Sequence, residues 1–275
     1  MTTHLSTGFE ALDAATGGLN GGELVLIGGR LGMGKTSFAL NLALNAANGF
    51  RDKGQSGVAF FSMERPLSQL SKRIPSTMTK IPSMKIIKGE LSADEFRQMT
   101  EAAEDLEKMP LYIDDTPALT LADLCDRCRK MKGVGLVVVD YLQLFKDKKK
   151  GSVLPKLKET AEKLNVPVVV LSQLTRAPEN RKDKRPRLDD VRTFKDLSVV
   201  DKVLFLYRES YYLLFDMPEQ GENETDEAFY DRKYEWEERL LSAEKECDVI
   251  VAKTPSGERG TVTLRFDPAT GFFGG

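Results

Sequence analysis

The chain has 275 residues, of which 41% are hydrophobic and 30% charged, and its formal net charge is −2 at pH 7. This size and composition fit one large α/β domain, or two small ones, with a buried core. They exclude a general electrostatic attraction to nucleic acid, so any such binding has to come from local basic patches.

The sequence contains neither an export signal nor a membrane span. The first six residues lack the basic and apolar regions of a signal peptide. No apolar run reaches the roughly 18 residues that a span needs. Three cysteines without an export signal indicate a reducing compartment. We therefore expect a cytoplasmic protein with no membrane partner.

The first strong pattern in chain order is a glycine-rich stretch at residues 28–37. From Gly29 it fits G-x-x-x-x-G-K-[ST], the phosphate-binding loop of nucleotide triphosphatases. A short buried strand is predicted before it, at residues 23–27, and an Ala/Leu-rich helix after it, at residues 38–47. A flexible glycine turn that matches by chance is the alternative, and both flanks argue against it.

In this setting backbone N–H groups and a helix N-terminus face the phosphates of a nucleotide. Lys35 is expected to reach the β- and γ-phosphates, and the Thr36 hydroxyl to ligate Mg²⁺. The predicted nucleotide-binding residues are Gly29, Arg30, Gly32, Met33, Gly34, Lys35, Thr36 and Ser37.

Strands and helices alternate along the rest of the chain. Further strands are predicted at residues 58–62, 111–115, 136–140, 167–172 and 203–207, and helices at residues 67–77, 92–108, 120–131 and 155–164. This alternation predicts one α/β domain over residues 1–275, with a mostly parallel central sheet and helices on both faces. Residues 247–252 and 261–266 are expected to form a C-terminal β-hairpin on the edge of the sheet. The acidic residues 213–246 are interpreted as a helical surface insertion, too short and polar to be a domain.

Two carboxylates follow predicted strands. Asp140 comes after four apolar residues, where a phosphate-loop protein needs a carboxylate near Mg²⁺, although a strand-end cap is the alternative. Glu64 follows the strand at residues 58–62, which we expect beside the first strand. There it would face the γ-phosphate and orient or deprotonate the attacking water. A surface Glu in a turn explains Glu64 equally well.

Two basic clusters follow strands that are expected to end at the same edge of the sheet. The first holds Lys146, Lys148, Lys149 and Lys150, and the second holds Arg176, Arg181, Lys182, Lys184, Arg185 and Arg187. Gln173 directly precedes the second cluster, where it would sense the γ-phosphate or serve as an ordinary strand-end residue. We expect both clusters to bind single-stranded nucleic acid through its phosphates, against the alternative of solvated loops.

Cys125 and Cys128 form a C-x-x-C pattern on a predicted helix. A zinc site needs a second pair of ligands, and His4 and Cys247 do not supply one. We therefore expect no metal at these cysteines.

Six motifs fall in order along nearly the whole chain. They are Thr7-Gly8-Phe9, Gly32-Met33-Gly34-Lys35-Thr36, Phe61-Ser62-Met63-Glu64, Asp140-Tyr141-Leu142-Gln143-Leu144, Leu171-Ser172-Gln173-Leu174 and Asp183-Lys184-Arg185-Pro186. Together they resemble the C-terminal motor domain of the DnaB replicative helicases. The resemblance implies a RecA-like P-loop fold, ATP hydrolysis with Mg²⁺, a homo-hexameric ring, replication partners and translocation on single-stranded DNA. It also implies that Glu64 is catalytic together with Lys35, that Asp140 lies on the metal side and that Gln173 senses the γ-phosphate.

The chain departs from that family where subunits would meet. The family usually has Lys-x-Arg acting on the neighbour's γ-phosphate; here Lys253 matches, Pro255 does not, and Arg259 is the expected substitute. The family's N-terminal collar and linker helix are also missing, so we expect weak ring assembly without ligands. Residues 192–196 and the acidic insertion are further differences.

Two other functions stay open. One is an accessory ATPase of the same family that switches between nucleotide states without unwinding DNA. The other is a different RecA-like ATPase, such as a recombinase or a KaiC-like kinase, although the Asp183-Lys184-Arg185-Pro186 loop argues against it.

Overall fold

The structure is a computed structural model that describes residues 4–51, 57–117, 119–131, 133–145, 153–191 and 197–275. The strands are β1 (His4–Leu5), β2 (Leu19–Asn20), β3 (Leu24–Gly29), β4 (Gly57–Ser62), β5 (Leu111–Asp114), β6 (Val134–Asp140), β7 (Val168–Gln173), β8 (Lys202–Tyr207), β9 (Glu246–Lys253), β10 (Gly260–Asp267) and β11 (Phe272–Gly274). The helices are α1 (Glu10–Thr16), α2 (Lys35–Arg51), α3 (Leu67–Thr79), α4 (Ser83–Lys88), α5 (Ala93–Lys108), α6 (Leu121–Lys130), α7 (Val153–Leu164), α8 (Glu209–Leu213) and α9 (Asp226–Ala243). The described residues also include the short 3-10 helices η1 (Leu142–Leu144), η3 (Ala177–Asn180) and η4 (Leu188–Asp190).

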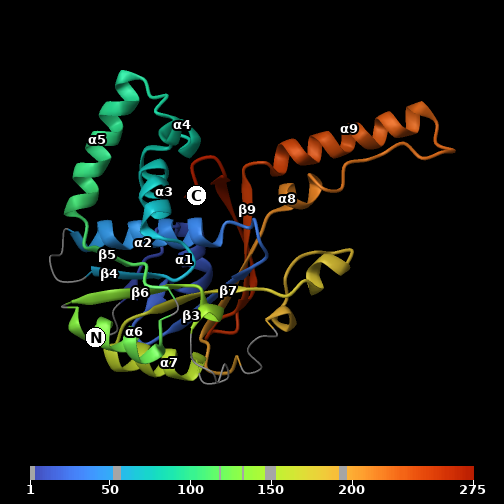
Figure 1. The fold of residues 1–275 in the computed structure, drawn as a ribbon. Helices are drawn as coiled ribbons and strands as arrows, with labels where there is room; N and C mark the ends of the chain where they lie inside the picture. Colours follow the sequence, from blue (N-terminus) through green and yellow to red (C-terminus); the bar gives the residue numbers. More distant parts are fainter. Residues whose placement is uncertain (1–3, 52–56, 118, 132, 146–152, 192–196) are drawn as a thin grey trace.

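Among the described residues, nine strands form one sheet in the order β11-β10-β9-β8-β3-β7-β6-β4-β5. Figure 1 shows strands β4 and β6 of this sheet between helix α2 above and helices α6 and α7 below. The six from β8 to β5 are parallel, and β9, β10 and β11 continue the sheet in antiparallel fashion. The predicted mostly parallel sheet is therefore confirmed.

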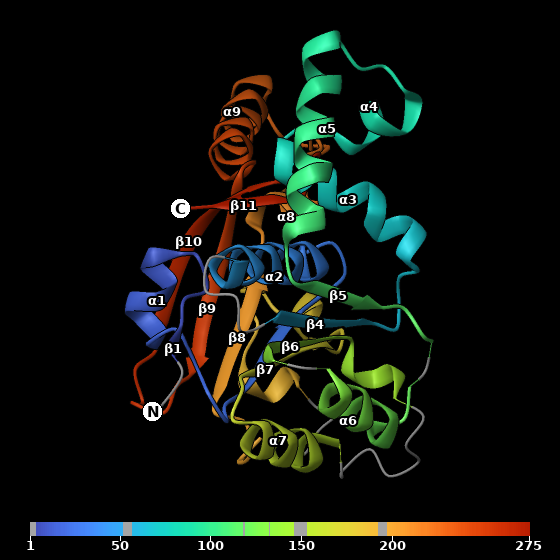
Figure 2. The ribbon, with the colours of Figure 1, turned by 90° about the vertical axis from the view of Figure 1, so that its left-hand side faces the viewer.

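Helices cover both faces of this sheet (Figure 2). Phe38 and Leu42 of α2 pack in one hydrophobic core, and Leu124 of α6 with Leu157 of α7 in the other. Strands β3, β4 and β8 are buried along their whole length. Such strands are apolar at almost every position because neither face meets water.

Two expectations about strand positions are wrong. β4 does not lie beside β3, because β7 and β6 stand between them. The β9–β10 hairpin is not the edge of the sheet, because β11 pairs with β10 outside it. Phe273 of β11 is 3% exposed and packs against Phe38 and Phe266, which fixes this last strand on the core. Alternating strands and helices predict a parallel sheet but not the order of its strands.

Residues 213–246 project from the body of the molecule as an arm that contains α9 (Figure 1). This segment holds twelve acidic and four basic side chains. Its own contacts order the arm: Arg232 pairs with Glu224 at 2.7 Å, and the indole Nε1 of Trp236 donates to the Leu213 carbonyl. Within α9 only Ala243 is buried. The arm therefore adds surface rather than core.

No helix among the described residues combines the length and the apolar character that crossing a bilayer requires.

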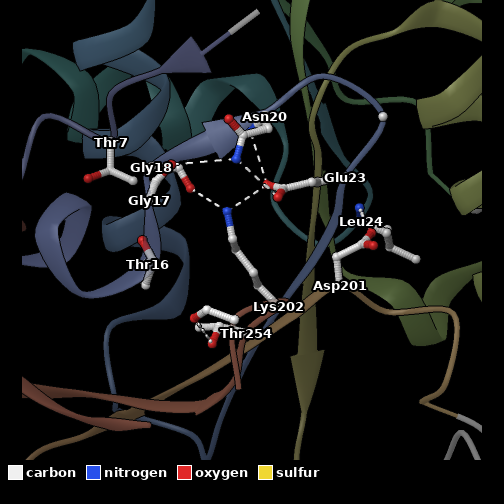
Figure 3. Close-up of polar contacts among 12 residues, drawn as sticks. Thr7, Thr16, Gly17, Gly18, Asn20, Glu23, Leu24, Asp201, Lys202 and Thr254 are labelled. Atoms are coloured by element: carbon white, nitrogen blue, oxygen red, sulfur yellow. Dashed lines mark hydrogen bonds and ion pairs between the residues drawn. The ribbon is translucent and has the colours of Figure 1, made fainter. Parts of the chain in front are cut away.

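A buried ion pair anchors the start of β3 to the start of β8. Lys202 is 2% exposed, and its Nζ donates to Glu23 Oε2 at 2.6 Å and to the Gly18 carbonyl at 2.7 Å (Figure 3). The Glu23 carboxylate also accepts from the Asn20 backbone N–H and side-chain amide. These contacts fix the amino end of the strand that leads to the phosphate loop.

We predict that Lys202→Met lowers the free energy of unfolding by about 3 kcal/mol, because the Glu23 carboxylate loses its cationic partner. The double variant Lys202→Met with Glu23→Gln should recover part of the loss. Urea unfolding followed by circular dichroism measures both. Lys163→Met, which breaks a surface pair with Glu159, is the control that should change stability little. Equal effects of the two lysine substitutions would contradict the anchoring role.

Candidate nucleotide-binding site

The predicted phosphate loop connects β3 to α2 as expected. Gly32 and Gly34 have φ of 78° and 86°, which favours glycine over residues with a side chain. A Cβ at Gly32 would lie 2.3 Å from the Tyr211 ring, so glycine is also needed for packing. Helix α2 begins at Lys35, and its N-terminus therefore faces the loop, where backbone N–H groups favour an anion.

Lys35 is held inside the loop. Its Nζ donates to the Gly29 carbonyl at 2.8 Å and to the Arg30 carbonyl at 3.0 Å. Burial lowers the pKa of Lys35 to about 8, while the nearby Asp140 and Glu64 carboxylates oppose the shift. The Lys35 ammonium is thus largely desolvated, and the negative charge of a bound phosphate would stabilise it.

Thr36 and Asp140, the two predicted metal ligands, are in direct contact. The Thr36 hydroxyl donates to Asp140 Oδ2 at 2.8 Å. Asp140 ends β6 and is 1% exposed, and burial raises its pKa to about 6 against the Thr36 hydrogen bond. A hydroxyl and a carboxylate are oxygen ligands of the kind that Mg²⁺ takes. The pair therefore fits a divalent cation beside the loop.

Glu64 lines the same pocket although its strand does not adjoin β3. The pocket measures about 230 Å³ and includes Gly32, Gly34, Lys35, Thr36 and Ser37 from the loop and α2. β4 is parallel to β6, so the residues after both strands come to one edge of the sheet. Glu64 thus reaches the loop from the far side of Asp140.

Three arginines of this pocket were missed by the sequence reasoning: Arg65, Arg73 and Arg208. Arg65 and Arg208 follow strands β4 and β8, and this position after a strand could have identified them as pocket residues. Arg73 lies within α3, and nothing in the sequence pattern indicates that it faces the loop. Burial, and then Arg65, lowers the pKa of Arg73. Cations crowded in this way fit a polyanion.

Two of these arginines carry an unsatisfied donor. The Nε atoms of Arg65 and Arg208 are buried and have no hydrogen-bond partner among the described residues. Buried donors normally have a partner, so these atoms favour a ligand that supplies acceptors. The guanidinium of Arg208 also lies 4.8 Å from the centre of the Phe266 ring, which lines the pocket. The pocket therefore fits an anionic ligand, and the Phe266 ring forms part of its wall.

Not every predicted nucleotide-binding side chain faces the pocket. Met33 is 1% exposed and packs in the core. Arg30 pairs with Glu179 at 2.7 Å instead of lining the pocket. Gln173 ends β7 beside β6, and its backbone N–H and carbonyl bond the side chain of Gln143. Gly29 contributes the carbonyl that holds Lys35.

Of the two basic clusters, only the second lies within the described residues. Lys146 and Lys148–Lys150 lie outside the described residues. In the second cluster, four cations already have carboxylate partners: Arg181 with Asp190, Lys184 with Asp216, Arg185 with Asp248 and Arg187 with Asp183. Arg176 and Lys182 are exposed and have no ion pair within the described part of the chain. A charge run in the sequence therefore overstates the charge that is available to a ligand.

Lys253 and Arg259 lie far from this pocket. Lys253 ends β9 opposite Val203 at the start of β8, and β8 is parallel to β3. A six-residue strand such as β3 spans about 20 Å. The phosphate loop follows the carboxyl end of β3, and the two residues therefore lie near the other end of the strands. The Lys253 Nζ donates to the carbonyls of Leu197, Ser198 and Val200, and Arg259 is exposed. Neither side chain can act on the pocket of its own chain.

Cys125 and Cys128 lie on α6 as predicted. The Cys125 Sγ is 3.0 Å from the Thr160 hydroxyl, and Cys128 is buried with its pKa raised to about 12 by desolvation. Within the described ranges, no cluster of three His, Cys, Asp or Glu side chains is placed to hold a metal. Cys125 thus contacts α7, and Cys128 packs in the hydrophobic core.

Known proteins resemble this chain in sequence. It is 37% identical over 289 residues to the replicative DNA helicase DnaB of Rickettsia prowazekii, which covers 98% of this chain and 58% of the relative. It is 33% identical over 277 residues to that of Geobacillus stearothermophilus, with 96% and 55% covered. The chain therefore spans a little over half the length of these relatives.

Solved structures agree with this likeness. A DnaB-like replicative helicase, described with its interactions with primase, superposes with a TM-score of 0.81 at 29% identity, covering 99% of this chain and 62% of that one. A second solved structure, described as an ATPase domain, gives the same TM-score and identity and covers 99% and 91%. The family model for the DnaB-like helicase C terminal domain matches residues 4–274. The chain belongs to the DnaB-like helicase C-terminal domain family and has its RecA-like α/β fold.

Proposed function

We propose that this chain is an ATP-driven motor that uses Mg²⁺ and moves along single-stranded DNA during replication in the cytoplasm. The observation that carries the proposal is the convergence of Lys35, the Thr36–Asp140 pair and Glu64 at one pocket. Family membership supports the same function. A structural relative is described with its interactions with primase, so replication proteins of that kind are the proposed partners.

Each side chain of the pocket has a distinct task in the proposed reaction. Thr36 and Asp140 would hold Mg²⁺, which when bound neutralises charge on the β- and γ-phosphate oxygens. Lys35 exchanges its bonds to the Gly29 and Arg30 carbonyls for the phosphates. Glu64 orients the attacking water and accepts its proton.

The arginines around the pocket complete its electrostatics. Arg65 and Arg73 would offset the charge that moves to the γ-phosphate, because donors in a desolvated site act strongly on developing charge. Arg208, which lies over Phe266 at the pocket, would contact the rest of the nucleotide. Gln173, at the end of β7, would sense the γ-phosphate.

The DNA would bind where the basic loop leaves β7. Arg176 and Lys182 are exposed cations of this loop without an ion pair among the described residues, and the segment at residues 146–150 follows the adjacent strand β6. Contacts of this kind neutralise phosphates and are largely indifferent to base sequence.

A second copy of the chain would complete the site, because Lys253 and Arg259 cannot reach the pocket of their own chain. We propose a ring, a homo-hexamer as the family resemblance implies, in which Arg259 of one copy faces the nucleotide of the next. One observation favours the accessory ATPase instead: Lys253 is already engaged with three carbonyls of its own chain.

We predict that Glu64→Gln binds an ATP analogue within about threefold of the parent and hydrolyses ATP at least about 100-fold more slowly, because the water loses its base. Fluorescence titration and phosphate release measure the two effects. Lys35→Ala should lose tight binding instead. Asp115→Asn is the matched control, since Asp115 caps the Leu67 N–H and does not line the pocket. Parental turnover in Glu64→Gln would place the catalytic carboxylate elsewhere.

We predict that replacing Arg176 and Lys182 together with Ala weakens binding of single-stranded DNA and flattens its salt dependence. Each lost phosphate contact should lower the slope of log affinity against log salt by about 0.7. Lys130→Ala is the control, because Lys130 precedes β6 and lies at the opposite edge of the sheet. A slope equal to that of the control would show that Arg176 and Lys182 belong to a solvated loop that does not bind DNA.

We predict that the specific ATPase rate rises with protein concentration and that Arg259→Ala removes this rise. An arginine supplied by a neighbour is worth about 10³-fold or more in phosphoryl transfer. Affinity for an ATP analogue should stay near the parental value, because the residue lies outside its own pocket. Arg265→Ala, which removes an exposed arginine of strand β10, is the control. Identical rates for the two variants would exclude Arg259 from catalysis.

A further inference from the structure

Arg30 belongs to the phosphate loop by sequence, but its side chain contacts the segment that follows β7. Its Nε and Nη2 atoms each lie 2.7 Å from Glu179 Oε1, and its Nη1 donates to the Leu174 carbonyl at 2.8 Å. The Arg30 side chain is only 9% exposed. All three nitrogens are therefore engaged by the segment that follows β7.

Glu179 lies in the middle of the basic loop. It is part of η3, between the exposed cations Arg176 and Lys182. Arg181 holds this loop together: it pairs with both oxygens of the buried Asp190, at 3.0 and 2.8 Å, and donates to the Arg185 carbonyl. The basic loop is thus stabilised by its own contacts, and Arg30 binds it at Glu179.

The strands add a second connection at the same place. In the β3–β7 register Gly29 pairs with Gln173, and the Leu174 N–H donates to the Gly29 carbonyl. Arg30 is the next residue after Gly29, so the phosphate loop and the basic loop begin side by side. A displacement of Arg30 as the loop closes on phosphates would shift Glu179 and the cations beside it.

Burial differs between the two partners: the Arg30 side chain is 9% exposed, whereas that of Glu179 is 39% exposed. Both charges act on the buried Tyr212, whose pKa is raised to about 12 by burial and then by Glu179, with Arg30 opposing. Charges interact more strongly where water is scarce, and removing one partner leaves the other without compensation. The buried guanidinium of Arg30 therefore depends on contacts with the segment that follows β7, which links the two loops.

We infer that Arg30 and Glu179 are positioning residues that couple nucleotide binding to DNA binding. The inference rests on the proposed motor function and deepens it. Coupling of this kind is reciprocal: ATP raises the affinity for DNA by the same factor by which DNA raises the affinity for ATP. Breaking the pair should reduce that factor without removing either binding site.

Glu179→Gln tests the inference, because the amide keeps the shape of the side chain and loses its charge. The dissociation constant of a fluorescent oligothymidine is measured with and without a non-hydrolysable ATP analogue, and their ratio is the coupling factor. We expect a factor of roughly 5 or more in the parent, within the usual range for coupled sites, and a factor near 1 in Glu179→Gln. DNA affinity without the analogue should stay within about threefold of the parent. Asp189→Asn, an exposed carboxylate beyond the same loop, is the matched control and should keep the parental factor.

Arg30→Lys is an independent second variant. Its ammonium keeps the charge but cannot hydrogen-bond Glu179 and the Leu174 carbonyl in the way that the planar guanidinium does. It should lose the coupling too, and the double variant should be no worse than either single one. A parental coupling factor in Glu179→Gln overturns the inference, as does an equal loss of DNA affinity with and without the analogue. A coupling factor of 1 in the parent would instead overturn the proposed motor function, and this inference with it.

Discussion

Strands β3, β7 and β6 are parallel neighbours, so the segments that follow them meet at one edge of the sheet. Because these strands are buried on both faces, polar groups can act only where a strand ends. Lys35 follows β3, Asp140 ends β6 and Gln173 ends β7. The same geometry carries Lys253 and Arg259 to the opposite edge, since β9 runs antiparallel to β8. One constraint thus separates the residues at the chain's own pocket from Lys253 and Arg259, which we propose act on a neighbouring copy.

Desolvation is the main physical effect at the pocket. Burial lowers the pKa of Lys35 and raises that of Asp140, because both charged forms are costly away from water. Without a ligand, Lys35 relies on backbone carbonyls and Asp140 on the Thr36 hydroxyl. A phosphate bound with a divalent cation would stabilise both charges at once. This requirement explains why anion and metal would bind as a unit.

Much of the site could be predicted from the sequence, because each motif combines a residue type with a strand end. The Thr36–Asp140 contact spans 104 positions and still follows from that reasoning. What could not be predicted depends on packing between distant segments. Arg73 reaches the pocket only because of how α3 packs, and Arg185 is neutralised by Asp248, 63 positions away. The direction of Arg30 and the place of β4 were likewise set by tertiary contacts rather than by local pattern.

The most direct test of the proposed motor is the steady-state ATPase rate as single-stranded DNA is added at fixed protein and Mg·ATP concentrations. Because the basic loop and the phosphate loop leave adjacent strands, we expect a saturable rise of several-fold, with half the effect near the DNA concentration that half-fills the binding site. An unchanged rate at DNA concentrations that saturate binding would contradict the motor function and favour an ATPase that only switches between nucleotide states.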